Sequence, residues 1–199
     1  NSTPIQAEKS LYDLAEWCRE DPGLQNFLLS GSLEERVESV RTGAQPDSVN
    51  EAVWQEFCRR WQDHLDAYGH ILYNLDFSRR IPADDPTPML ELIRMYLQGK
   101  GTNPHERQQK LETSRQQAVE KQFARLRGIR RWAFRLALNM GQSMAQVREN
   151  SIADIGLGYP AIRRILLEAG RRFTVAGAIA QPEDIFWLEY EEVKLLASA

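Results

Sequence analysis

Cysteine is scarce in this sequence: only Cys18 and Cys58 occur among 199 residues. The two fall in separate predicted helices, and so small a number does not make the disulfide framework of a small secreted domain. A reduced, cytoplasmic setting is therefore expected. Residues 1–8 are polar, without the basic-then-apolar pattern of a signal peptide and without an initiator methionine. We therefore expect a processed chain or an excised piece of a longer protein.

Long hydrophobic runs and a strong charge of either sign are also lacking. No stretch of about eighteen apolar residues occurs, so no transmembrane helix is predicted. The formal net charge is -3 at pH 7, which is too mild to demand a nucleic acid or an anionic membrane as a partner. A chain of 199 residues can still bury a real core, as one domain or two small ones.

Catalytic and cofactor motifs are missing as well. The glycines are isolated, so there is no Gly-rich phosphate-binding loop, and no serine has the neighbours of a nucleophile elbow. His64 and His70 are six residues apart with a glycine between them, and His105 is distant, so metal-ligand spacing is absent. We therefore predict no catalytic residue, metal site or cofactor in this chain, and we interpret the histidines as structural or solvent-exposed.

What the sequence does contain is helical periodicity almost throughout, with apolar residues three and four apart. Ser32 is a predicted N-cap, because Glu34 and Glu35 follow it in the first turn. Asp47 or Ser48 is expected to cap a later helix that ends at Gly69. The apolar face of that helix comprises Val53, Trp54, Phe57, Trp61, Leu65 and Tyr68.

A proline-rich stretch over 70–88 is predicted to be irregular, and a compact helix follows over 89–97. Asn103 and Pro104 then give a strong start signal for a helix that we expect to continue to about Glu149. Its length requires partners along the rod, and its apolar residues are expected to face a core. They are Leu111, Ala118, Leu126, Ile129, Ala133, Leu136, Met140, Met144 and Val147.

Gly128 and Gly141 lie inside this predicted helix and cost it about 1 kcal/mol each. Pro160 is expected to start an antiparallel return helix, and residues 185–188 have the only pattern that would suit a short strand. The predicted fold is all-α, an elongated helical bundle with long antiparallel helices. We expect a single helical domain over 1–199, composed of N-terminal helices (1–69), an irregular loop (70–88), and a long-helix hairpin with a C-terminal exit (89–199).

Three groups of charged residues are candidates for ligand contact. The 70–88 loop carries both signs of charge, and local ion pairing with Asp84-Asp85-Pro86 as a helix cap is the alternative. The arginine run over 125–135 contains Trp132 and suits phosphates or bases, although a solvated helix face fits its spacing better, so nucleic acid is not favoured. The third group, from Arg148-Glu149 to the arginine pairs at 163–164 and 171–172, is either structurally paired or an anion site. The candidate ligand-binding residues are His70, Asp76, Arg80, Arg148, Arg171 and Arg172.

Several short motifs also follow one another in a recognisable order. The later ones are Arg148-Glu149-Asn150, Gly170-Arg171-Arg172-Phe173, Gly177-Ala178-Ile179, Glu183-Asp184-Ile185-Phe186-Trp187-Leu188 and Glu192-Val193; the earlier ones are Tyr68-Gly69-His70, Asp76-Phe77-Ser78 and Asp84-Asp85-Pro86. Over roughly residues 60–199 this order resembles the phosphoenolpyruvate-utilising phosphotransferases, which include phosphoenolpyruvate synthase and the rifampicin phosphotransferases. Arg80-Ile81-Pro82 departs from the Pro-Arg-Trp of that family.

The resemblance implies a place within a larger enzyme. Such proteins have an ATP-grasp domain, a central helical region, and a domain whose histidine carries phosphate. This chain resembles the central region alone, so the other two domains of the same polypeptide are its implied partners, and ATP and Mg are implied for the parent protein. Its implied role is to bind the acceptor, as the apolar helical pocket of rifampicin phosphotransferases binds the antibiotic, or to space the two domains. The alternative is an independent helical protein-interaction module that uses the aromatic face of residues 53–68 and the long helix.

Overall fold

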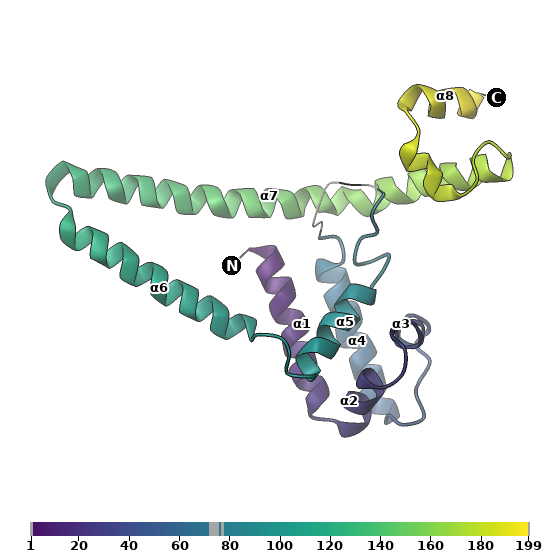
Figure 1. The fold of residues 1–199 in the computed structure, drawn as a ribbon, viewed down its shortest axis with the longest axis horizontal. Coiled ribbons are helices and arrows are strands. Elements are labelled where there is room, and N and C mark those ends of the chain that lie inside the picture. The colour runs from purple at the N-terminus through teal and green to yellow at the C-terminus, as the bar shows by residue number, and fades with distance from the viewer. Residues whose placement is uncertain (1, 72–75, 77, 199) are drawn as a thin grey trace.

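The computed structural model of the chain describes residues 2–71, 76 and 78–198. Every regular element in this part of the chain is a helix (Figure 1), so the all-α prediction is confirmed. The elements are α1 (Thr3–Arg19), α2 (Pro22–Leu29), α3 (Leu33–Thr42), α4 (Glu51–Tyr68), α5 (Thr87–Leu97), α6 (Pro104–Arg125), α7 (Gly128–Val175), the 3-10 helix η1 (Pro182–Trp187) and α8 (Tyr190–Ser198). In place of the short strand considered over 185–188, residues 185–187 belong to η1 and Leu188 follows it. None of the described helices has the length and apolar character needed to cross a membrane.

Helices α1 to α5 form a bundle that contains the main hydrophobic core. The predicted aromatic face of α4 supplies its centre, where the rings of Trp54 and Phe57 stack at 5.5 Å and those of Phe57 and Trp61 at 6.3 Å. The side chains buried in this core are Leu11, Leu14, Ala15, Cys18, Leu24, Phe27, Leu28, Val40, Val49, Trp54, Phe57, Trp61, Met89, Leu90, Ile93, Tyr96 and Leu97. The bundle is thus built from the amphipathic faces that the sequence periodicity identifies.

Helix caps follow the sequence signals with one exception. The Ser32 side chain accepts a hydrogen bond from the Glu35 amide at 3.2 Å, and Asn103 accepts from the His105 amide at 2.9 Å, as predicted. The cap of α4 is Asn50, which accepts from the Ala52 amide at 2.9 Å, rather than Asp47 or Ser48. All three residues are good N-caps, so residue type alone does not select among neighbours.

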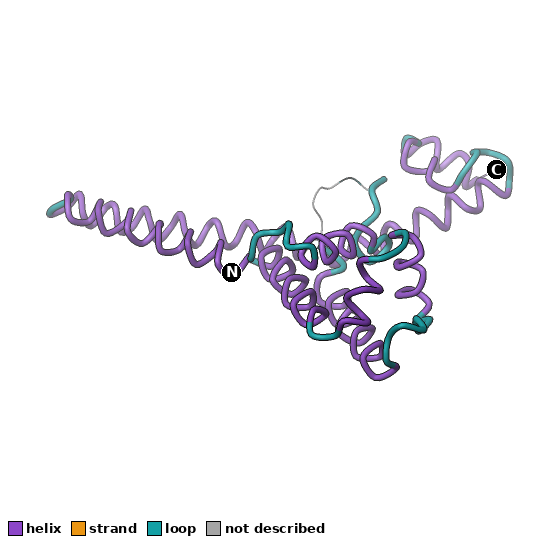
Figure 2. The backbone as a smooth tube through the Cα atoms, turned by 60° about the horizontal axis from the view of Figure 1, so that its bottom comes forward, coloured by secondary structure: helices purple, strands orange, loops and turns teal. Residues whose placement is uncertain are grey.

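The predicted continuous helix over 104–149 is wrong, because the chain turns back between α6 and α7. Gly128 adopts φ +55, a left-handed conformation that glycine tolerates and that a straight helix does not contain. Near this turn the rings of Phe123 and Phe134 meet edge to face at 5.2 Å, and Arg131 lies over the Phe123 ring. We refer to α6 and the part of α7 up to Val147 as the arm, which projects from the bundle in Figures 1 and 2.

The expected return helix at Pro160 is also wrong, because α7 passes through Pro160 without ending. Proline removes one helical hydrogen bond but has a helix-compatible φ, so packing on both sides can hold the helix together. Tyr159 is buried against Ile81, and Arg163 is buried one turn beyond the proline. The helix ends instead at Val175, and Gly177 follows with φ +74.

The long apolar seam does not face a core within this chain. The exposed large side chains on α6 and α7 include Leu111, Ile129, Trp132, Leu136, Met140, Met144 and Val147. Near its turn the arm packs on itself through Phe123 and Phe134. The expectation that this seam is core-facing is therefore wrong for the chain by itself.

The C-terminal segment, residues 176–198, folds back so that η1 packs on the last part of α7. Phe173 of α7 and Ile185 of η1 are both buried. Gly170 allows this close approach, because a Cβ atom at that position would overlap the backbone carbonyl of Pro182. A glycine inside a helix thus serves a packing role here.

Gly170→Ala should destabilise the chain by about 1–3 kcal/mol, because the added methyl forces η1 away from α7. The matched control is Gly141→Ala on the same helix, where nothing lies within 4 Å. That change should stabilise the chain by about 1 kcal/mol through helix propensity. Urea denaturation of both variants measures the two effects, and equal stabilisation by both alanines would contradict the packing role.

Candidate functional site

The loop after α4 is closed at its base. The Ala83 amide donates to the Gly69 carbonyl at 3.0 Å, which brings the two ends of the loop together. Within it, Asp76 accepts hydrogen bonds from the Ser78 hydroxyl at 2.7 Å and the Ser78 amide at 3.0 Å. These bonds, with a smaller contribution from Arg79, hold the pKa of the Asp76 carboxyl below its usual value. Residues 72–75 and 77 lie outside the described part of the chain, including the Phe77 of the predicted motif.

Arg163 joins this loop to α7 and to η1. Its side chain is only 2% exposed, and its Nε donates to Asp84 Oδ2 at 3.0 Å. The guanidinium also lies over the Phe186 ring, 4.9 Å from the centroid. The two acidic residues of the loop have different contacts, because Asp84 pairs with Arg163 while Asp85 accepts from the Thr87 amide at 3.1 Å, just before the N-cap of α5, which is Pro86. The local ion-pair interpretation fits Asp84.

The six candidate ligand-binding residues lie in separate places. Arg171 and Arg172 both donate to Glu168, at 2.8 and 2.9 Å, and these bonds lower the pKa of Glu168 to about 2. Arg148 is exposed on α7, about 35 Å from that pair at 1.5 Å per residue. The side chain of Glu149, which belongs to the same charged group, lies outside the described part. Ligand roles for these three arginines therefore stay predictions, and one shared anion site is not formed.

The remaining three candidates belong to the loop beside the bundle. His70 is half-buried, Asp76 is exposed, and Arg80 reaches the rim of an apolar cleft. The outer part of this cleft has a volume of about 380 Å³ and is lined by Leu11, Arg80, Pro82, Asp85, Pro88, Met89, Glu91, Leu92 and Met95. Of the three loop residues, Arg80 is thus the one that the structure places at a cavity.

The cleft continues inward between α1 and α5. The inner part, about 290 Å³, shares Leu11, Pro82, Met89 and Leu92 with the outer part. Its further lining residues are Pro4, Ile5, Ala7, Glu8, His64 and Tyr68. Two methionines on α5 give the wall an adaptable, polarisable surface, and the charged lining residues are Arg80, Asp85 and Glu91 in the outer part and Glu8 in the inner part. Such a cavity suits a largely apolar small molecule that is oriented by a few polar contacts.

His64 separates the inner cleft from a second, more polar pocket of about 550 Å³. The side chain is 3% exposed, and its Nδ1 lies 2.9 Å from the Ser10 hydroxyl. Burial lowers the pKa of His64 to about 4, so the ring is neutral at pH 7. His64 lines both cavities. The sequence does not predict this position, because it indicates only a structural or solvent-exposed histidine.

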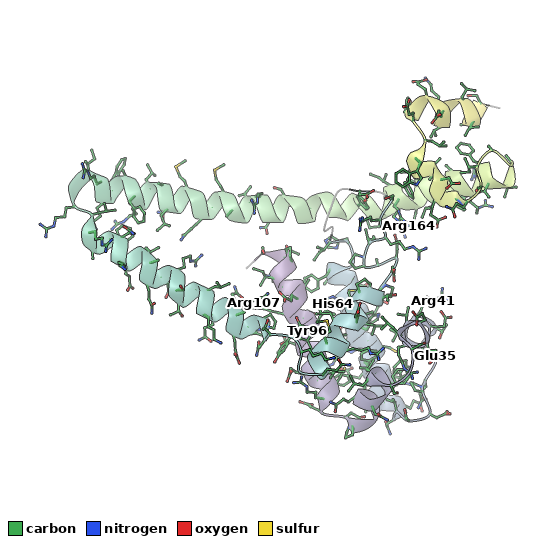
Figure 3. All side chains as sticks on the ribbon, viewed as in Figure 1. Glu35, Arg41, His64, Tyr96, Arg107 and Arg164 are labelled. Atoms are coloured by element: carbon green, nitrogen blue, oxygen red, sulfur yellow. The ribbon has the colours of Figure 1, made fainter. Side chains whose placement is uncertain are left out.

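Contacts at the base of the arm hold α6 beside these cavities. His105 Nε2 lies 2.7 Å from Asp13 of α1, and Arg107 pairs with Glu8. Figure 3 shows Arg107 at this junction, with Tyr96 and His64 in the bundle. Since Glu8 also lines the inner cleft, the arm is anchored directly at the cleft wall. No cluster of three or more potential metal ligands occurs among the described residues.

A sequence model of a protein family matches residues 3–149, and its description reads Rifampicin phosphotransferase fourth domain. The match includes helices α1 to α5, both parts of the cleft and the whole arm. No curated protein matches the chain. The motifs over 170–193 that carry part of the resemblance lie beyond the matched residues.

Asp84→Asn should lower the free energy of unfolding by about 2 kcal/mol, because a buried guanidinium loses a carboxylate partner. Glu168→Gln is the control, since it removes a carboxylate that pairs with two exposed arginines. Little measurable change is expected there, because exposed pairs contribute little. Thermal and urea unfolding provide the comparison, and equal effects would refute the anchoring role of Asp84.

His64 should make stability depend on pH. Its pKa is about 4 in the folded chain and about 6.5 when unfolded, so the unfolded state binds the proton first. The stabilisation is complete above pH 6.5 and is lost as the pH falls toward 4, by up to about 3 kcal/mol. Urea titrations between pH 4 and 7 should show a shallower dependence for His64→Gln than for the wild type. An unchanged dependence would argue against a neutral buried imidazole.

Proposed function

The chain belongs to the family of rifampicin phosphotransferase fourth domains, and on that premise we propose that it is the non-catalytic, acceptor-binding helical domain of such a phosphotransferase. The acceptor occupies the cleft between α1, α5 and the loop that carries Arg80. The ATP-grasp and phosphohistidine domains of the same polypeptide supply the chemistry, with ATP and Mg as their cofactors. The chain acts as one domain that presents the acceptor and spaces these two partners.

The shape and chemistry of the cleft carry this proposal. A wall of leucine, methionine and proline side chains favours an apolar acceptor body, whose burial contributes about 25 cal/mol per Å². Arg80, Asp85 and Glu91 stand at the rim, where they can orient the hydroxyl that receives the phosphate. A rim of this kind leaves one polar edge of a large acceptor outside the apolar wall and accessible to another domain.

The anchored base of the arm supports the spacing role. The contacts of His105 with Asp13 and of Arg107 with Glu8 fix α6 to α1, while Arg163 fixes α7 to the loop. The cleft thus lies between two attachment points of one rigid hairpin. A domain that docks on the arm would therefore have a defined position relative to a bound acceptor.

The second candidate is an independent helical protein-interaction module. The exposed apolar side chains of α7 favour it, because such a surface suits a protein partner. The aromatic face of α4 does not, because Trp54, Phe57 and Trp61 are buried in the core. The parent open reading frame separates the candidates, since an upstream ATP-grasp pattern and a downstream Gly-rich histidine motif would place the chain in an enzyme.

Met95→Lys should weaken binding of rifampicin at least tenfold, because it places a charge on the apolar wall of the cleft. Met95 is already 42% exposed, so the fold should tolerate the change. Leu111→Lys is the matched control, an exposed apolar residue on α6 outside the cleft. Titration calorimetry with rifampicin as the probe measures both variants. No binding by the wild type, or equal loss in both variants, would contradict the proposed acceptor site.

A further inference from the structure

One face of α7 carries an apolar stripe that is exposed in the described part of the chain. Its side chains on the arm are Ile129, Leu136, Met140, Met144 and Val147, with Trp132 at the edge. Their spacings of seven, four, four and three residues keep them on one side of a helix with about 3.6 residues per turn. Phe134, which packs on Phe123 of α6, points to another side. Ile162 and Ile165 extend exposed apolar surface along the second half of α7.

The end of the arm is strongly cationic. Between residues 121 and 147 the sequence has one lysine and five arginines and no aspartate or glutamate. The chain as a whole carries -3, so the positive charge of this end is opposed by an excess of acidic groups elsewhere. A covering partner must therefore present apolar surface beside negative charge.

The C-terminal segment has this combination. Its acidic residues are Glu183, Asp184, Glu189, Glu191 and Glu192, against the single cation Lys194. Trp187, Tyr190 and Leu195 are all exposed, and α8 has no buried residue among those described. Like the arm, this segment thus exposes large apolar side chains.

The arm end and the C-terminal segment lie at opposite ends of the molecule (Figure 1), so one copy cannot bring them together. We propose that a second copy of the chain covers the stripe, with the two α7 helices antiparallel across a two-fold axis. The cationic arm end of each copy then meets the acidic C-terminal segment of the other. A two-fold interface makes both contacts at once. Two-fold symmetry is also the commonest symmetry in which identical chains pair.

The spacing at the two ends of α7 fits this arrangement, whereas nearer the axis the same register places Met140 opposite Asp154 and Leu136 opposite Gly158. If the axis passes beside Val147, Ile129 lies opposite Ile165 of the second copy, because each is 18 residues from the axis. Trp132 and Ile162 are paired in the same way, each 15 residues away. A face about 54 Å long and about 10 Å wide on each helix buries on the order of 1,100 Å² in total. With the end contacts added, this reaches the range of a specific interface, which begins near 1,200 Å².

Nucleic acid or an anionic membrane would complement only part of this combination of an apolar stripe, a cationic arm end and an acidic C-terminal segment. Either would neutralise the arginines, but the acidic C-terminal segment that follows α7 would be repelled. Exposed apolar side chains also recur beyond the cationic end at Ile162 and Ile165, where a polyanion offers no matching contact. A second copy provides an apolar contact for Ile162 and Ile165 and complements both charged ends.

Light scattering on a size-exclusion column tests the assembly of the 199-residue chain. The wild type should have twice the 22.9 kDa of one chain, and dilution should dissociate it. Leu136→Glu should weaken dimerisation at least tenfold, whereas Leu111→Glu on α6, outside the stripe, should not. A monomer at all concentrations, or equal effects of both variants, overturns the proposal. So does a monomer that binds phosphatidylserine vesicles or single-stranded DNA instead.

Charge reversal tests the reciprocal contact. One variant carries Arg127→Glu with Arg130→Glu, and the other carries Glu189→Lys with Glu191→Lys. Each alone should be monomeric, because like charges then face each other at both ends of the pair. Mixed in equal amounts they should form a heterodimer, since both end contacts become complementary again. This recovery also shows that the variants are folded, and its absence overturns the arrangement.

Discussion

The contact between the buried Arg163 side chain and Asp84 is the constraint on which the arrangement of the molecule depends. A guanidinium removed from water needs its carboxylate in a fixed place, so the contact sets both the position and the rotation of α7 over the bundle. Tyr159, packed on Ile81 one turn earlier, reinforces the same orientation. Because a helix is stiff over many turns, fixing it at residues 159–163 also fixes the direction of the arm. It further decides which face of α7 points away from the bundle, and that face carries the uncovered stripe.

The sequence predicts those features of the fold that neighbouring residues in the chain determine. The Ser32 and Asn103 caps and the aromatic face of α4 each follow from a few neighbouring residues. The two errors on the long helix have non-local causes. Gly128 and Gly141 look alike in the sequence, yet only the first is a turn, because Phe123 and Phe134 can close a hairpin around it. Pro160 does not end α7 because contacts with the loop and η1 hold the helix on both sides.

The cleft shows why binding sites of this kind escape sequence analysis. Leu11, Met89 and Leu92 line a cavity, but their helical spacing is the same as that of the core residues beside them. Charged residues stand out more clearly in a sequence as candidates for ligand contact. One of those in the 70–88 loop, Arg80, lies at the rim of the cleft. The family was recognised partly from motifs over 170–193, whereas the family match covers residues 3–149. Several of those C-terminal residues contribute to packing in the structure. Gly170 allows the backbone of Pro182 to approach α7 closely, and Phe173 and Ile185 are buried.

Acceptor binding and assembly would use separate surfaces of the chain. The cleft is formed by α1, α5 and the loop, while the stripe belongs to α7, which contacts the bundle through other residues. A substitution on the stripe would therefore change association without touching the cleft wall. The connection between them is mechanical, since Arg163 and the base of α6 fix the arm to the bundle. Pairing through α7 would hold two such hairpins together along their length, and so set the separation and relative orientation of two clefts.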